Sequence, residues 1–303
     1  MVLNVSSVKL FQKCRLRWLY EFVYGRVPRK GSLPLEFGKL LHIVFEYHVR
    51  DGLAMGEAID VAIADWQARM VSAEYLDRLA GEEACAELHS MREPLSLWTD
   101  QYPMTTLAVE EPFEYPHPTE PGLSIKGRPD REVLCFGKLW HVQNRSLNAG
   151  KKILLYSELM KSDLHELTYA WALPQKYPQY EYGGTIFNIV RKLKYRGKPT
   201  KAVPEGKILH TLDEIMGQIA VPMLETQKAH ALMDLAWIGR EMDHVIQEAH
   251  EGRFPARNRD MDGGPFGNSK DPYWPVFMGE ADLFDDTLFK SREDPYAPSA
   301  LEV

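Results

Sequence analysis

The chain has 303 residues, of which 45% are hydrophobic and 26% are charged, as in an ordinary globular protein. Its apolar runs are far shorter than the roughly 18 residues that read as a membrane-spanning helix. The first residues lack a charged start followed by an apolar stretch, so no secretory signal is expected. Three widely spaced cysteines, Cys14, Cys85 and Cys135, indicate a reducing compartment without a disulfide framework. We therefore expect a cytoplasmic protein.

The distribution of charge is more informative than its sum. The net charge of −7 by itself disfavours binding to nucleic acid. However, residues 1–50 carry nine Lys or Arg against three Glu, and residues 190–210 carry seven against one, whereas residues 279–303 are acidic. Local basic patches can steer a polyanion, while total charge mainly sets solubility. The alternative for either segment is an ordinary solvated face.

The first hundred residues have helical patterns. Ser6 or Ser7 can cap a first helix, which carries an apolar stripe and, on another face, a basic row. The stripe is Leu10, Phe11, Cys14, Trp18 and Phe22, and the row is Lys9, Lys13 and Arg17. After a loop at 26–34, further helices are expected at 35–49, 54–69 and 80–98.

The sequence after residue 100 is β-prone and rich in proline. Strands are expected at 105–110, 123–125, 131–136, 139–142 and 184–190, with Phe136-Gly137-Lys138 as a turn. A helix at 153–173, broken by Pro174, and a long helix at 222–251 follow. Helices and strands in this order predict an α/β core with a helical N-terminal part. We expect a single domain over 1–303, divided into a helical part (1–102), a core (103–192), a basic arm (193–210), and a C-terminal helix with an irregular tail (211–303).

Two adjacent strand segments carry the most informative polar residues. Asp130, in Gly127-Arg128-Pro129-Asp130, is a suitable ligand for a hard cation, and thirteen residues later Gln143 offers a neutral amide oxygen. Because side chains alternate along a strand, Gln143 and Arg145 share one face and Asn144 points to the other. Arg145 can stabilise a phosphate by its charge but cannot relay a proton as lysine can. A Pro-Asp turn and an exposed polar strand are the alternative.

Further polar residues stand before and after this pair. His42 lies four residues after Gly38 on the second expected helix, and Glu46, one turn later, can orient it. Glu110 is at the end of an expected strand. His165 and Tyr169 share one face of a helix.

In this order, the motifs resemble the PD-(D/E)XK nuclease superfamily, specifically its RecB-like branch with CRISPR-associated exonucleases and phage relatives. The matching residues are Ser6 to Tyr20 for the opening helix, Gly38 and His42 for Gly-x-x-x-His, Glu110 for the Val-Glu strand, Gly127, Asp130 and Arg131 for Gly-x-x-Asp-Arg, Gln143 to Arg145 for acid-x-Lys, and His165 and Tyr169 for Gln-x-x-x-Tyr. The resemblance covers roughly residues 5–190. It implies a restriction-endonuclease-like core, a central mixed sheet flanked by helices, in a bacterial or phage-infected cell.

The resemblance also implies roles. His42, Asp130 and Gln143 are the expected ligands of Mg²⁺ or Mn²⁺, and Arg145 occupies the catalytic lysine position. Tyr169 is expected to contact DNA or organise the site, with Glu46, Glu110 and His165 as accessory residues. The branch often carries an iron–sulfur cluster, and Cys14 matches its first cysteine. Because residues 254–278 contain no cysteine, we expect no cluster, and the segment 272–275 is expected to clasp the two ends of the chain instead.

The basic segments are the expected DNA contacts, with Tyr195 available to stack on an unpaired base. The basic residues are Lys9, Lys13, Arg17, Arg191, Lys192, Lys194 and Arg196. No base-reading motif is visible, so binding should be independent of sequence. A recombination or replication protein is a further possible partner.

Three functions stay open at this point. The first is a metal-dependent DNA nuclease of exonuclease type, acting on DNA ends or single strands. The second, suggested by the neutral Gln143 and the non-titrating Arg145, is a catalytically silent module that binds DNA or a protein. The third is an α/β protein with coincidental spacing, which would place His42, Asp130 and Gln143 far apart.

Overall fold

The computed structural model describes residues 1–28, 33–71, 75–147, 163–193, 207–255, 273, 276, 280–286 and 288–291. The chain divides into two compact units. One comprises 1–30, 112–127 and 229–303, and the other comprises 31–111 and 128–228. The single domain expected from the sequence stays a prediction. No helix among the described residues is long and apolar enough to cross a membrane.

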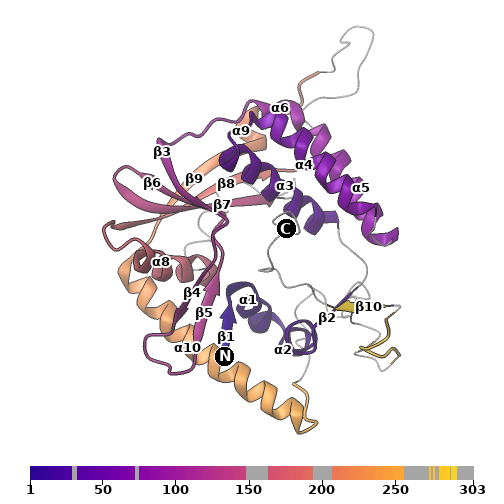
Figure 1. Cartoon of the computed structure of the whole chain (residues 1–303), viewed down its shortest axis with the longest axis vertical. Helices are drawn as coiled ribbons and strands as arrows, with labels where there is room; N and C mark the ends of the chain where they lie inside the picture. The colour runs from indigo at the N-terminus through magenta and orange to yellow at the C-terminus, as the bar shows by residue number, and fades with distance from the viewer. Residues whose placement is uncertain are drawn as a thin grey trace. The chain divides into compact units, whose positions relative to one another are not determined.

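The second unit is built on a five-stranded mixed sheet in the order β3-β6-β7-β8-β9. Its strands are β3 (Met104–Val109), β6 (Arg131–Cys135), β7 (Lys138–Leu147), β8 (Tyr182–Arg191) and β9 (Met216–Pro222). Only the β7–β8 pair among these is parallel. With helices on its faces (Figure 1), this sheet confirms the expected fold class, a mixed sheet flanked by helices in a restriction-endonuclease-like arrangement.

A two-residue turn joins β6 to β7. Cys135 pairs with Lys138, and Phe136 and Gly137 between them have φ of 50° and 74°. Positive φ at both turn residues matches the twist of the flanking strands and favours a tight hairpin. β7 then continues five residues beyond the expected end, because it pairs in register with β8 from Trp140 to Leu147. Gln143, Asn144 and Arg145 therefore stand on a central strand.

Four helices form an apolar cluster that covers one face of this sheet (Figure 1). They are α3 (Leu33–Arg50), α4 (Met55–Met70), α5 (Tyr75–Ser90) and α6 (Arg92–Ser96). The cluster includes Leu40 of α3 and Val190 of β8, both fully buried. The expected helix at 80–98 is interrupted at Met91, which leaves the helical region at ψ 1°. Pro94, which has no N–H to donate, is tolerated because the interruption places it in the first turn of α6.

Helix α8 (Leu164–Lys176) supplies polar contacts on the opposite face. The expected break at Pro174 is wrong, because the helix continues to Lys176. Lys176 donates hydrogen bonds to Glu111 and to the buried Glu132, and these contacts fix the last turn although proline removes one backbone bond. The part of the expected helix at 153–162 lies outside the described residues. A short helix α9 (Leu212–Ile215) precedes β9.

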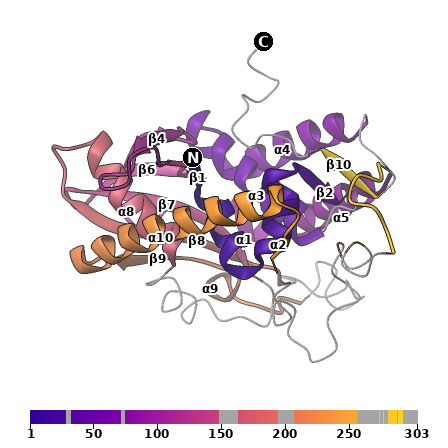
Figure 2. The ribbon, with the colours of Figure 1, turned by 90° about the horizontal axis from the view of Figure 1, so that it is seen from below.

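The first unit contains a three-stranded sheet and, from residue 229 on, the long helix α10 (Glu225–His250). The sheet is formed by β1 (Val2–Asn4), β5 (Ser124–Gly127) and β4 (Phe113–Pro116). Figure 2 shows α10 running past this sheet, and a Cβ added at Gly239 of α10 would approach Leu123 to 3.0 Å. Glycine therefore permits close packing here.

The N-terminal segment of this unit includes α1 (Val5–Lys13), α2 (Arg15–Trp18), a π-helical turn (Leu19–Val23) and β2 (Arg26–Pro28), which pairs with β10 (Phe289–Ser291). The cap of α1 is Asn4, not the expected Ser6 or Ser7. Its side chain accepts from the backbone N–H of Ser6, the contact that makes asparagine a strong N-cap.

The described part of the expected clasp lies in the same unit. Tyr273 is fully buried and donates a 2.8 Å hydrogen bond to the carbonyl oxygen of Arg26. Its ring stacks on Phe289 and contacts Tyr20. A residue of the segment 272–275 thus joins the two ends of the chain, while its neighbours in that segment lie outside the described residues.

Candidate active site and metal centre

Three side chains from three elements of the second unit meet at one point. His42 comes from α3, Glu110 follows β3, and Asp130 precedes β6. His42 Nδ1 lies 3.2 Å from Asp130 Oδ2 and 4.0 Å from Glu110 Oε1, and one ligand atom of each residue lies within 4.8 Å of the others. Ligand atoms around one octahedral cation at about 2.1 Å are roughly 3 to 4 Å apart. The cluster therefore fits a divalent cation, and no other group of at least three His, Cys, Asp or Glu in the described residues does so.

The backbone sets the positions of both carboxylates. Glu110 has φ of 52°, a left-handed conformation that costs a non-glycine residue about 1–2 kcal/mol. Its N–H donates to the carbonyl oxygen of Asp130, which ties the end of β3 to the start of β6. Asp130 Oδ2 in turn accepts a 2.6 Å hydrogen bond from the backbone N–H of Asn144 on β7. Strain held in this way often marks a functional position, and here it brings Glu110 to the cluster.

The electrostatics of the cluster are those of crowded carboxylates. Burial and the neighbouring Asp130 raise the pKa of Glu110 to about 8, although His42 and Arg128 oppose this. Burial also disfavours charge on His42 and on Asp130, but their mutual attraction outweighs it. The pKa of His42 is therefore raised and the pKa of Asp130 is lowered. A group of acids that resists full ionisation is one that a bound cation would stabilise.

Gln143 carries an unsatisfied acceptor. Its side chain is buried, and no donor among the described residues bonds to Oε1. A buried acceptor left unpaired costs roughly 1–3 kcal/mol, so such an atom needs an explanation. Gln143 directly precedes Asn144, whose N–H holds Asp130. Gln143 stands at the third expected ligand position, and its unpaired oxygen is a donor that a cation site would use.

Neighbouring positions on β7 face opposite sides, as expected. The side chain of Asn144 accepts from Asn188 on β8, and Asn188 accepts from Gln218 on β9, so three paired strands carry one buried row of amides. Arg145 instead contacts Glu166 of α8 on the other face. The amide row holds β7 in register with β8, and thereby fixes the N–H that binds Asp130.

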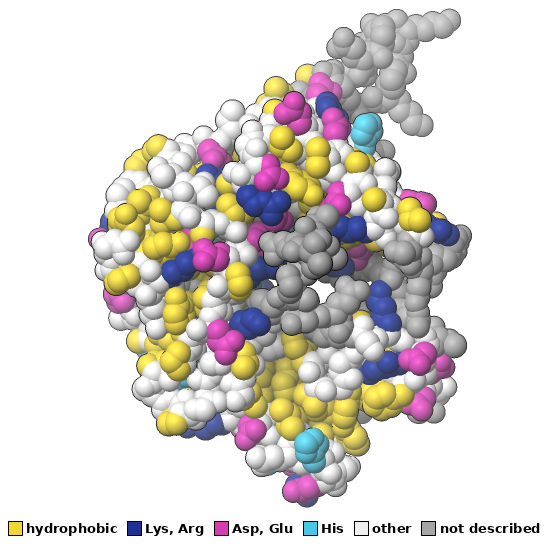
Figure 3. All heavy atoms as spheres, viewed as in Figure 1, with side chains coloured by type: hydrophobic (Ala, Val, Ile, Leu, Met, Phe, Trp, Pro, Cys, Tyr) yellow, Lys and Arg dark blue, Asp and Glu magenta, His cyan; other side chains and the backbone are white. Residues whose placement is uncertain are grey.

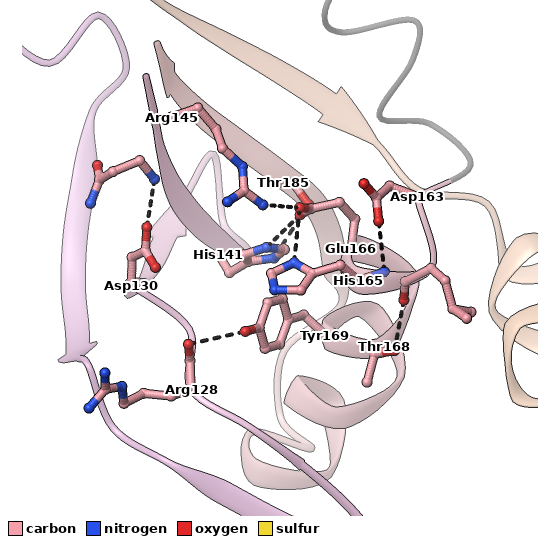
Figure 4. Close-up of polar contacts among 12 residues, drawn as sticks. Arg128, Asp130, His141, Arg145, Asp163, His165, Glu166, Thr168, Tyr169 and Thr185 are labelled. Atoms are coloured by element: carbon pink, nitrogen blue, oxygen red, sulfur yellow. Dashed lines mark hydrogen bonds and ion pairs between the residues drawn. The ribbon is translucent and has the colours of Figure 1, made fainter. Parts of the chain in front are cut away.

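Glu166 is a residue that the sequence analysis did not single out. It is only 1% exposed and accepts from four side chains (Figure 4). The donors are His141 Nε2 at 2.9 Å, Arg145 Nη2 at 3.2 Å, Thr185 Oγ1 at 3.2 Å and His165 Nδ1 at 3.3 Å. Burial opposes its charge, but the hydrogen bonds from His141 and His165 bring its pKa well below the usual value. Glu166 therefore holds Arg145 in place, and the charge of Arg145 also lowers the pKa of Asp130.

The accessory residues take several positions. Tyr169 donates a 3.1 Å hydrogen bond to the carbonyl oxygen of Arg128, and its ring packs edge-on against His165 (Figure 4). Tyr169 thus fixes the segment that leads into Asp130. Glu46 pairs with Arg50, and His42 is oriented by Asp130. Glu110, expected as an accessory residue, lies within the cluster itself.

The expected DNA contacts are described only in part. Lys9 and Lys13 are exposed on α1, whereas Arg17 pairs with Glu21. Arg191 donates to the carbonyl oxygen of Glu214, and Lys192 pairs with Glu87 above the ring of Phe37. Lys194, Tyr195 and Arg196 lie outside the described residues. On the face in Figure 3, Lys and Arg side chains lie beside Asp and Glu side chains.

The mixed sheet flanked by helices is that of a restriction-endonuclease-like fold, and the histidine–carboxylate cluster lies where β3 and β6 meet. The family model of the PD-(D/E)XK nuclease superfamily matches residues 2–261. The chain belongs to this superfamily, and membership supports a nuclease that acts with a divalent metal. No curated protein matches the chain. The match shows that the order of the motifs is not coincidental. The structure brings His42 and Asp130 to 3.2 Å, whereas the convergence of Gln143 with them stays a prediction.

Proposed function

We propose that the protein is a Mg²⁺- or Mn²⁺-dependent DNA nuclease of the RecB-like branch. It would hydrolyse phosphodiester bonds at DNA ends or in single strands, as an exonuclease does, during recombination, repair or phage replication. The observation that carries this proposal is the convergence of His42, Glu110 and Asp130. The order of the motifs and the absence of a visible base-reading element support DNA binding that is independent of sequence.

In this proposal His42, Glu110 and Asp130 hold the cation, with Gln143 as a neutral fourth donor. A bound Mg²⁺ or Mn²⁺ supplies Lewis acidity and an activated water at the scissile phosphate. The N–H of Asn144 donates to Oδ2 of Asp130, the same oxygen that lies 3.2 Å from His42 Nδ1, and thereby fixes the carboxylate at the cluster. Arg145, anchored by Glu166, presents a permanent positive charge to the phosphate, but it does not take up a proton.

The direct test uses labelled single- and double-stranded DNA with Mn²⁺. Asp130→Ala should abolish cleavage and also the thermal stabilisation by Mn²⁺. Glu111→Gln is a matched control, because Glu111 is the acid next to Glu110 but pairs with Lys176. Undiminished cleavage by Asp130→Ala would refute the nuclease, as would the absence of cleavage by the native chain.

A second candidate is a catalytically silent module that binds DNA or a protein partner. The neutral Gln143 and the anchored, non-titrating Arg145 favour it. The variant that combines Gln143→Glu with Arg145→Lys separates the two candidates. In a silent but intact fold this variant should create or greatly raise cleavage, whereas efficient cleavage by the native chain would exclude the silent module.

A further inference from the structure

An exposed arginine stands at the outer side of the cluster. Arg128 Nε lies 3.0 Å from Glu110 Oε2, while Glu110 Oε1 faces His42. The Arg128 side chain is 41% exposed and that of Glu110 is 17% exposed. The carboxylate of Glu110 therefore has one oxygen directed at the cluster, while its other oxygen contacts the solvent-exposed guanidinium of Arg128.

The backbone of Arg128 is fixed, so only its side chain is free to change position. Tyr169 donates to its carbonyl oxygen, and the next residue, Pro129, is buried and restricts the chain before Asp130. In Figure 4 the carbonyl group of Arg128 faces Tyr169, while its guanidinium extends away from that ring. An arginine held by its main chain can exchange one anionic partner for another without moving Asp130.

Arg128 and a cation at the cluster would compete for Glu110. In the metal-free protein, the guanidinium of Arg128 is a positively charged neighbour of Oε2 of Glu110. A divalent cation bound to the same carboxylate would repel the guanidinium and weaken this ion pair. The planar guanidinium would then be free for two parallel hydrogen bonds to a phosphate, the anion that its geometry suits best. Arg145 is less suited to this exchange, because it is only 24% exposed and is held by the buried Glu166.

We propose that Arg128 is a phosphate-binding residue of this site, which pairs with Glu110 in the metal-free protein and with a non-bridging oxygen of the DNA backbone when a cation is bound. This proposal rests on the proposed function in one respect: both assume that a divalent cation and DNA bind at the cluster. It predicts effects of opposite sign on the two ligands when Arg128 is removed, whereas a merely structural arginine would weaken both.

The test compares Arg128→Ala and Arg128→Lys with the native chain. Arg92→Ala is the matched control, because Arg92 is 42% exposed and pairs with Asp60 away from the cluster. Titration calorimetry with Mn²⁺ alone should show Arg128→Ala binding about twofold to fivefold more tightly, the equivalent of an exposed ion pair. For a labelled single-stranded oligonucleotide in Mn²⁺, the KM should rise on the order of tenfold with kcat less affected. Arg128→Lys should fall between the native chain and Arg128→Ala.

If the native chain does not cut, the Kd of the same oligonucleotide in Mn²⁺ replaces the KM, so that failure of the nuclease proposal is separable from failure of this one. Unchanged or weaker binding of Mn²⁺ by Arg128→Ala would overturn the exchange of partners. Unchanged affinity for the oligonucleotide would overturn the phosphate contact. Equal effects of Arg92→Ala would also count against it.

Discussion

Replacing Glu166 by glutamine should destabilise the protein more than its small change in shape suggests. Each oxygen of Glu166 accepts from two donors: Oε2 from His141 and Thr185, and Oε1 from Arg145 and His165. The side-chain amide of glutamine has one oxygen and one NH₂ group. In either orientation, the NH₂ group therefore faces two groups that donate to Glu166 in the native chain. The less costly orientation places the NH₂ group toward His141 and Thr185, because the histidine can change its tautomer and the hydroxyl can rotate. Arg145 then lies beside the neutral amide oxygen instead of a carboxylate oxygen.

The magnitude follows from the burial of the pair. Breaking a fully buried ion pair by removing one partner costs roughly 3–5 kcal/mol. Glu166 is 1% exposed, but the Arg145 side chain is 24% exposed, so solvent recovers part of that loss. We expect a decrease of about 2–3 kcal/mol in the free energy of unfolding, or roughly 5–10 °C in Tm. Because the folded pKa of Glu166 is lowered, its contribution is present above the unfolded pKa and is lost as pH falls through the folded pKa. The difference from the native chain should thus be constant between about pH 5 and 8 and shrink in acid.

The assay is thermal unfolding of Glu166→Gln, Arg145→Met and the double variant. Glu181→Gln is the matched control, because Glu181 is a 73% exposed acid of the same unit that pairs with Lys138. The reasoning is refuted if Glu166→Gln lowers Tm no more than Glu181→Gln does. It is also refuted if the effects at 145 and 166 are additive, because a held guanidinium requires coupling between the two sites.

Two further predictions concern the cluster. In EDTA, the stability of the native chain should fall between about pH 5 and 8, because folded Glu110 retains its proton up to a pKa of about 8 whereas the unfolded carboxyl loses it near 4.5. The raised pKa of His42 acts in the same direction, and Glu110→Gln should flatten the slope of Tm against pH; an unchanged slope would contradict the assignment. Gln143→Leu should leave Tm in EDTA unchanged or higher, because it removes an unpaired buried acceptor, while it reduces the stabilisation by Mn²⁺. A marked loss of Tm in EDTA would mean that Gln143 is structural.

Local patterns predicted the parts of the site that local geometry determines. The spacing from Gly38 to His42 lies within one helix, and the alternation from Gln143 to Arg145 lies within one strand, so both followed from the period of the element. The hairpin that brings Asp130 beside β7 followed from its turn residues. These features depend only on residues that are close in the sequence. The structure confirms the helix α3 and the strand β7 on which the residues lie.

The contacts of Glu166 could not be derived in the same way. His141 and Glu166 are 25 residues apart and meet only because the chain crosses over between the parallel strands β7 and β8. A signal for a buried charge was nevertheless present. Glu166, Ala170 and Leu173 stand at positions i, i+4 and i+7 of α8, and all three are buried. An acid within an apolar stripe indicates a buried charge with partners, although it does not name them.

The two departures from the family pattern have different physical consequences. An acid at position 143 and a lysine at 145 would place one negative and one positive charge on the same face of β7. Here Gln143 is neutral, and the charge of Arg145 is balanced by Glu166, which lies outside the group of cation ligands. Under the proposed function, the cation site has one negative ligand fewer than the motif pattern, while the charge at position 145 is held in place by Glu166. In this proposal Glu110 is the second carboxylate of the site, and its left-handed backbone and raised pKa support that role. Cation affinity should consequently depend more strongly on Glu110 than the motif pattern alone suggests.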